Sequence, residues 1–492
     1  MSLGVTLNFY FGYIQECAFS RRDNLIKRLL VGICRTYIKK MNIKIVLLFL
    51  LCFSLTVDGT FAQKSKEKPN LEIAKMIREV SAKNIETTIR KLVSFGTRNT
   101  LSEQDNPTRG IGAARDWIFG EFQKISAACD SCLTVEKQPF LQPKAGRVPE
   151  PTNLTNVIAT LKGATNPARI YVVSGHYDSM CTSPTDAKCD APGANDDASG
   201  TAAVLELARV MSKRKFDATI VFMAVPGEEQ GLLGATYFAE QAKQKAMDIE
   251  GMFTNDIIGG VTTKKSSSNR NRVRVFSEGV PSNETEPQAN TRRSVGGEND
   301  SASRQLARYI KEQSNKYLKN FKVWMIYRRD RYGRGGDHIP FLERGFTAVR
   351  ITEVDEDYTH QHQNVRTENG IFYGDTPEFV DFEYAANVAR VNLISLASLA
   401  NAPAKPKNVG VVTTRLTNDT ELKWDANTDM DIAGYEIVWR ETTSPEWTNS
   451  FFVGNVGNFL AKERSKDNYF FGVRAIDRNG NKSPVSFPRP MR

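Results

Sequence analysis

Two glutamates, Glu228 and Glu229, stand side by side at the end of the apolar run "ATIVFMAVPGEE". Adjacent carboxylates raise the cost of ionising one another, so the pair calls for an explanation. One explanation is the first turn of a helix, where acids face the positive end of the helix dipole. The other is a bound cation, whose positive charge offsets the clustering of carboxylates.

Residue types that bind metals also lie at the ends of neighbouring apolar runs. His176 ends "RIYVVSGHYDS", Asp196 lies in the glycine-bounded turn "PGANDDASG", and Asp256 ends "MFTND". Taken singly, each has an ordinary explanation as a helix cap, a turn residue or a hydrogen-bonded strand end. Together with the glutamate pair they place a histidine or an acid at four successive strand ends, which predicts a metal site.

Several motifs occur together and in order over about 190 residues: "GHYDS", "PGANDDASGTAAVLELAR", "PGEEQGLLGA", "NDIIGG" and "YTHQHQ". In these motifs the chain resembles the bacterial leucyl aminopeptidase and aminopeptidase Y family of zinc exopeptidases. The resemblance implies two Zn²⁺ ions per chain. Its ligands would be His176 and Asp256 on one ion, Glu229 and His362 on the other, and Asp196 between them.

The same resemblance assigns two catalytic roles. Glu228 falls on the general base, which takes a proton from the water between the two ions. Asp178 falls on the acid that orients the imidazole of His176. Both Glu228 and Glu229 would then face the same oxygen, which explains why they are adjacent.

Of the chain's four histidines, three lie in the downstream part of the large domain: His338, His360 and His362. Only one of the pair His360 and His362 should be a ligand, and the match of "YTHQH" to a Tyr-x-x-Gln-His pattern favours His362. We expect His338 and its neighbour Asp337 to line the pocket or to be structural.

The surrounding pattern predicts an α/β fold. Helical spacing covers 71–95 and 110–128, and apolar β-rich runs then alternate with helical segments such as "SGTAAVLELARVMSK" and "LLGATYFAEQAKQKAM". This alternation is typical of a largely parallel mixed sheet between helices, in which ligands gather at the carboxyl ends of the strands. Residues 261–301 are polar and rich in turn formers, which predicts a surface insertion. Two further strands, "KVWMIYRRD" and "TAVRITEV", and a helix over 383–399 complete the domain.

A linker, "NAPAKPKN", separates this domain, residues 63–402, from a smaller one at 403–492. The runs "ELKWDA", "GYEIVWRET" and "NYFFGVRAIDRNGNKSP" predict a small all-β sandwich. Their spacing resembles a fibronectin type III domain. Such a module would contact another protein or a surface, or would stabilise the enzyme domain.

The N-terminal 62 residues are interpreted as a leader. A Lys, an apolar core and the small-residue exit "TFA" predict a secretory signal peptide that starts at Met41. The apolar run from Ile45 to Val57 is short for a membrane span, so we do not expect an integral membrane protein. The protein would be exported, to a periplasmic or extracellular location.

The leader also explains part of the formal charge of +10. It holds eight Lys/Arg and three Asp/Glu, a net of +5, which leaves +5 for the other 430 residues. That balance argues against a nucleic-acid-binding groove.

Removal of the leader would leave four of the seven cysteines: Cys129, Cys132, Cys181 and Cys189. In an exported chain these favour two local disulfides, Cys129 with Cys132 and Cys181 with Cys189, out of three possible pairings. A structural zinc site is the alternative, but it needs about four ligands and no second Cys-x-x-Cys is present.

Three functions are compatible with these features. The first is a two-zinc aminopeptidase that acts on peptides with a free N-terminus. The second is a glutaminyl-peptide cyclotransferase of the same fold with one zinc, although "NDDASG" is the peptidase form of the bridging turn. The third is a non-catalytic binding domain, which the presence of every ligand and of the base disfavours.

Overall fold

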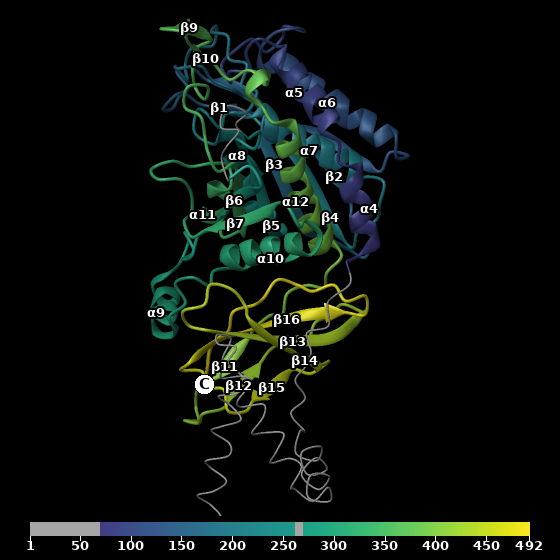
Figure 1. Cartoon of the computed structure of the whole chain (residues 1–492), viewed down its shortest axis with the longest axis vertical. Helices are drawn as coiled ribbons and strands as arrows, with labels where there is room; N and C mark the ends of the chain where they lie inside the picture. The colour runs from purple at the N-terminus through teal and green to yellow at the C-terminus, as the bar shows by residue number, and fades with distance from the viewer. Residues whose placement is uncertain (1–68, 261–268) are drawn as a thin grey trace, which may run out of the picture. The chain divides into compact units, whose positions relative to one another are not determined.

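A computed structural model describes residues 69–260 and 269–492 (Figure 1). The predicted leader and its signal peptide lie outside the described residues. An eight-stranded mixed sheet in the order β1-β2-β4-β3-β5-β8-β6-β7 forms the centre of the large domain. Its strands are β1 Leu133–Gln142, β2 Thr152–Leu161, β3 Asn166–His176, β4 Ala218–Val225, β5 Asp248–Asn255, β6 Arg272–Phe276, β7 Lys322–Ile326 and β8 Ala348–Thr352. The central strands β4, β3, β5 and β8 run parallel, as the apolar runs predicted.

Helices cover both faces of this sheet (Figure 1). One face packs on α4 Leu71–Glu79, α5 Ala82–Val93, α6 Gly110–Ala127, α7 Ala198–Met211, α10 Ala302–Tyr317 and α12 Phe382–Ala400. The other packs on α8 Leu233–Gln244 and α11 Ile339–Glu343. Tyr171 and Val173 of β3 enter the first core, and Ile170 and Val172 enter the second. Because successive strand residues point to opposite faces, a strand buried on both sides must be apolar throughout.

Two details differ from the sequence prediction. The helix expected over 71–95 is two helices, because Val80 is extended and Ser81 caps α5 with its side chain. The surface insertion expected over 261–301 is wrong for residues 272–276, which form β6 inside the main sheet. Val273 and Val275 are buried there. Alternating arginines mask this period-two pattern in the sequence. Helix α9, Glu286–Val295, occupies much of the remaining segment.

The carboxyl ends of β3, β4 and β5 lie at one edge of the sheet, where the predicted metal ligands are found. Strand β3 can approach the start of α7 closely because Gly175 and Gly200 face each other. A Cβ atom on Gly175 would lie 2.5 Å from the backbone carbon of Gly200. Larger residues here would move the end of β3 away from the helix that follows the Asp196 turn.

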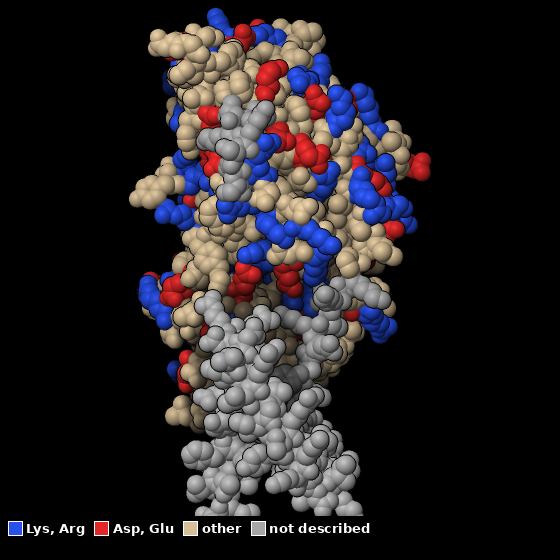
Figure 2. All heavy atoms as spheres, viewed as in Figure 1, with Lys and Arg blue, Asp and Glu red and all other residues tan. Residues whose placement is uncertain are grey.

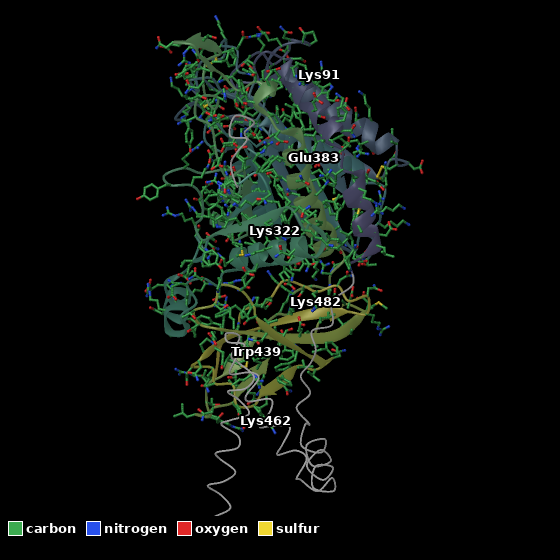
Figure 3. The ribbon with its side chains drawn as sticks, viewed as in Figure 1. Lys91, Lys322, Glu383, Trp439, Lys462 and Lys482 are labelled. Carbon is green, nitrogen blue, oxygen red and sulfur yellow. A yellow bond between two sulfur atoms is a disulfide. The ribbon has the colours of Figure 1, made fainter. Side chains whose placement is uncertain are left out.

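The C-terminal residues form two small sheets on a shared core. One has the order β15-β12-β11-β17 and the other β14-β13-β16. Their strands are β11 Gly410–Val412, β12 Thr420–Lys423, β13 Ile432–Glu441, β14 Asn449–Gly454, β15 Asn458–Ala461, β16 Tyr469–Asp477 and β17 Arg489–Met491. Leu422, Ile437 and Val473 are buried between the sheets. Trp439, labelled in Figure 3, packs its ring 4.9 Å from that of Phe451. This part is therefore the small all-β unit that the sequence predicted.

Buried polar contacts hold this unit against the large domain. Asp300, whose side chain is 1% exposed, accepts hydrogen bonds from Arg308 at 2.8 Å and from Arg440 at 2.7 Å. The indole N–H of Trp447 donates to Gln305 at 3.0 Å. Because removing one partner of a buried pair leaves an uncompensated charge, these contacts couple the folding of the two parts.

No helix in the described ranges is both long enough and apolar enough to span a membrane. Basic and acidic side chains are interspersed over the part of this face that Figure 2 draws in colour.

Candidate metal centre

His176, the last residue of β3, is held on several sides. Its ring Nδ1 lies 3.3 Å from Asp178 Oδ1, and the backbone N–H of His176 donates to Asp197 Oδ2 at 3.1 Å. The imidazole is only 1% exposed. With Nδ1 directed toward Asp178, the Nε2 atom is left to face Asp196 at 3.1 Å and Asp256 at 3.8 Å.

Asp178 also supports the glutamate pair. Its Oδ1 accepts the backbone N–H of Glu228 at 3.3 Å, and its Oδ2 accepts that of Glu229 at 3.2 Å. The hydroxyl of Thr100 donates to Oδ2 as well, at 3.1 Å. One buried carboxylate thus sets the position of His176 and of the loop that follows β4.

Asp196 lies in the turn before α7, and its two oxygens face different histidines. Oδ1 is 3.1 Å from His176 Nε2, and Oδ2 is 2.9 Å from His362 Nε2. The next residue, Asp197, caps α7 by accepting the N–H of Gly200. Asp197 also accepts the N–H of Ile257, so it connects this turn with the end of β5.

Glu229 belongs to the His362 side of the centre. Its Oε1 lies 3.0 Å from His362 Nε2, and its side chain is 4% exposed. His362 itself has φ +55°, a left-handed conformation that few residues other than glycine adopt. Glu228 is adjacent in sequence but belongs to none of the three groups of potential metal ligands among the described residues, the third of which is Cys181, Asp186 and Cys189.

Asp256, just after β5, is paired with a buried arginine. Its Oδ2 lies 2.8 Å from Nη1 of Arg350, a side chain that is fully buried in β8. Its other oxygen faces His176. Burial opposes ionisation of Asp256, but the Arg350 charge outweighs it and lowers the pKa of the carboxyl below its ordinary value. Asp256 therefore remains a carboxylate with one oxygen directed to the centre.

The remaining histidines, His338 and His360, are held by other contacts. His360 stacks on Phe379, with ring centroids 3.6 Å apart, and is not a member of either ligand group. His338 is buried, and its Nε2 contacts the carbonyl oxygen of Arg329 at 2.7 Å. Burial lowers the pKa of His338 to about 4, so it is neutral at ordinary pH. Asp337 is buried beside it, and neither of its oxygens has a hydrogen-bond partner within the described residues.

Two ligand groups result: His176, Asp196 and Asp256 form one, and Asp196, Glu229 and His362 form the other. Each group offers one atom per residue, all within 4.8 Å of one another. Within the described chain, His176 Nε2, His362 Nε2 and Glu229 Oε1 are buried and make no hydrogen bond of good geometry. Such orphaned atoms are costly unless a cation satisfies them, and imidazole with carboxylate is a donor set that suits zinc.

The electrostatics favour a cation in the same place. Burial opposes protonation of His362, but Glu229 and Asp196 outweigh it and raise its pKa to about 11. His176 is affected similarly, because Asp178 and Asp196 raise its pKa well above the ordinary value against the effect of burial. A pocket that attracts protons this strongly also attracts metal ions.

Glu228 is in a different environment from its neighbour. Burial raises the pKa of the Glu228 carboxyl well above its usual range; His176 opposes the shift, and the charges of Asp256 and Glu229 add to it. A carboxylate destabilised in this way is a stronger proton acceptor than one in water.

Both expected disulfides are present, Cys129–Cys132 and Cys181–Cys189. The second closes a loop between Asp178 and Asp196, two residues of the centre.

The sequence analysis missed several residues that support this centre. Asp375 accepts the backbone N–H groups of Asn195 at 2.9 Å and of Asp196 at 2.7 Å, which fixes the turn. Gln361 donates to Asp196 Oδ2 at 2.8 Å. Nothing in the local pattern identifies Asp375, because it follows an ordinary glycine turn 179 residues away from Asp196. Gln361 lay inside the "YTHQHQ" motif and could have been named.

Comparison with known proteins defines the family. Residues 156–371 match peptidase family M28. A "Probable zinc metalloprotease" of Leptosphaeria maculans is 49% identical over 422 residues, which cover 86% of this chain and 98% of the relative. A second, from Pyrenophora tritici-repentis, is 48% identical over 426 residues, covering 86% and 88%. The chain therefore belongs to peptidase family M28. It is a zinc metalloprotease, and peptides are its substrates.

Solved structures with a similar chain course include LapB from Legionella pneumophila, at 18% identity and a TM-score of 0.48, covering 66% of this chain and 73% of LapB. A glutaminyl cyclase of Porphyromonas gingivalis matches at 17% identity and a TM-score of 0.41, covering 64% and 97%.

Proposed function

We propose that this zinc metalloprotease is an aminopeptidase with two zinc ions, which removes the first residue from peptides with a free N-terminus. The observation that carries the proposal is the Asp196 carboxylate, whose two oxygens face the histidines of two different ligand groups. His176 and Asp256 would hold one ion, and Glu229 and His362 the other. Sites with two metal ions occur in several classes of enzyme, aminopeptidases among them.

Zinc, when bound, supplies the positive charge that polarises the scissile carbonyl and lowers the pKa of a water molecule. Glu228 would accept a proton from the attacking water molecule and would pass it to the amine that leaves when the peptide bond breaks. Asp178 keeps His176 in one orientation and, through its two backbone contacts, holds the glutamate pair in place. Asp375 keeps the bridging turn fixed in the same way.

A one-zinc glutaminyl-peptide cyclotransferase is the second candidate. The ion pair between Asp256 and Arg350 favours it, because this pair occupies one oxygen of a proposed ligand to the ion at His176. Against it, the other oxygen of Asp256 still faces His176, and the ligand group is complete. A non-catalytic domain would have no use for Glu228, which lies beside both groups without belonging to either.

The test combines metal content with three substrates. Zinc per chain is measured on dialysed protein, and hydrolysis is followed with an aminoacyl anilide, its N-acetylated form and a peptide that begins with glutamine. We expect two zinc ions and cleavage of the free-amine anilide alone. One zinc ion and ring closure of the glutamine peptide would establish the cyclotransferase instead.

We also propose that the protein is exported to an oxidising compartment, periplasmic or extracellular, which the two disulfides support. Sequencing the N-terminus of protein recovered from the medium or periplasm tests this, and an uncleaved Met1 would contradict it.

The C-terminal unit we propose to be fibronectin type III-like. Two sheets that share a core containing Trp424 and Tyr435 support this proposal. Its contacts with α10 favour a role in stabilising the enzyme domain.

A further inference from the structure

A cavity of about 800 Å³ opens onto the metal centre and is basic on one side. Glu228, Glu229 and His362 line its inner end. Arg147, Arg331 and Arg334 line it from two other segments, the β1–β2 loop and the loop after β7. Among the described residues that line the cavity, Glu228 and Glu229 are the only carboxylates, and the proposed function assigns both to metal binding and proton transfer.

Arg147 brings an unbalanced charge to this cavity. Its Nη1 donates to the backbone oxygen of Glu229 at 2.7 Å, which places the guanidinium beside the proposed ligand. No carboxylate in the described ranges lies within ion-pair distance of Arg147. A guanidinium carries five N–H donors in a fork that matches a carboxylate, so most of them are left for a ligand.

Arg334 contributes a second partly exposed guanidinium. Its Nη1 lies 2.8 Å from Glu356 Oε2, and its side chain is 32% exposed. The same Oε2 is 3.0 Å from Arg331, and the other Glu356 oxygen is 2.7 Å from Arg274. Arg331 also contacts Asp330 at 3.2 Å, so three guanidinium groups share two carboxylates and this wall keeps a positive charge.

We infer that Arg147 and Arg334 bind a carboxylate in the part of the substrate that follows the scissile bond. This inference rests on the proposed function. An aminopeptidase holds the free amine of its substrate at the metal end of the cavity, so the rest of the peptide must extend along the wall that Arg147 and Arg334 line. Two sources supply the same group: the C-terminal carboxylate of a dipeptide, or the side chain of an acidic second residue. Arg331 is 8% exposed and has three hydrogen-bond partners, so it supports the wall and does not bind substrate.

Four dipeptide substrates separate these sources. They share the first residue that is cleaved fastest as an anilide, followed by glutamine amide, glutamate amide, glutamine or glutamate. We expect kcat/KM to be roughly tenfold higher for a peptide with the recognised carboxylate than for glutamine amide, as one charged hydrogen-bonded contact allows. A gain for glutamate amide identifies the side chain, and a gain for free glutamine identifies the terminus. Added salt should reduce either ratio.

Arg147→Gln and Arg334→Gln should each bring the ratio toward one. Arg329→Gln is the matched control, because Arg329 belongs to the same loop as Arg334 but contacts Ser282 and Glu343. Comparing ratios within each variant cancels a general loss of stability or zinc. Equal rates on all four peptides, or an Arg329 effect as large as the others, overturn the inference. If none of the four is cleaved, the proposed function itself fails.

Discussion

Changing Glu228 to glutamine should separate proton transfer from metal binding. The carboxylate belongs to neither ligand group, and its backbone N–H, not its side chain, makes the contact with Asp178. Glutamine has nearly the same shape, so the loop and the zinc ions should stay. What is lost is the proton acceptor, and turnover should fall by roughly 10² to 10⁴ with little change in zinc affinity.

Glu229→Gln should instead weaken metal binding first and reduce activity as a consequence. Its Oε1 lies 3.0 Å from His362 Nε2, inside a ligand group, and its side chain is 4% exposed. Substituting residues that only support a ligand typically costs about 10 to 100-fold in metal affinity. Replacing the charged ligand itself should therefore cost roughly 100-fold or more for one of the two ions, and activity should return in part when zinc is added.

Zinc titration against a chelator and steady-state rates on both variants provide the measurement. Glu240→Gln serves as a control, because that glutamate is 47% exposed, lies in α8 and forms an ion pair with Arg344. If Glu228→Gln loses zinc and Glu229→Gln retains it, the two roles are exchanged. If both variants keep full activity, the pair is merely an acidic turn before α8 and the mechanism is wrong.

Three further predictions concern stability. Replacing Cys181 and Cys189 by serine should lower the free energy of unfolding by about 2 to 3 kcal/mol, measured in urea, because a small closed loop is released. Asp300→Asn should cost about 3 kcal/mol or more, since Arg308 and Arg440 would lose a buried partner; Asp190→Asn, on a 70% exposed side chain, should cost under about 1 kcal/mol. Burial opposes ionisation of Glu436, but Arg474 and Lys482 lower its pKa. Its ion pairs should contribute fully to the free energy of unfolding above about pH 4.3, the ordinary pKa of a glutamate, and this contribution should be lost as the pH falls from there through the lowered pKa of Glu436. Glu436→Gln should remove this part of the acid dependence.

The fold was predictable where burial leaves a periodic pattern. Strands β3, β4 and β5 are covered on both faces, so each reads as a continuous apolar run followed by a polar residue at the sheet edge. Strand β6 was not found because its outward positions are arginines. Arg274, for example, satisfies its charge on Glu356, a partner 82 residues away. The local sequence shows the charge of Arg274, but it does not show the distant carboxylate that allows this arginine to lie in a strand of the main sheet.

In the metal centre, the sequence likewise predicts the proposed ligands but not the residues that hold them in place. Three of the proposed ligands, His176, Glu229 and Asp256, lie at or just after the ends of β3, β4 and β5, so their chain order already placed them at one edge of the sheet. Asp196 lies in the turn before α7 and His362 in the loop after β8, and the family motifs located both. The residues that hold those ligands come from elsewhere: Asp375 from the segment before α12, and Arg350 from the interior of β8. A charged residue inside an apolar strand looks like an error in the pattern until Asp256 is found 2.8 Å from it. Arg350 is therefore intelligible only from the tertiary structure, and the interruption of an otherwise apolar strand by one charge is the sequence signal that such a partner exists.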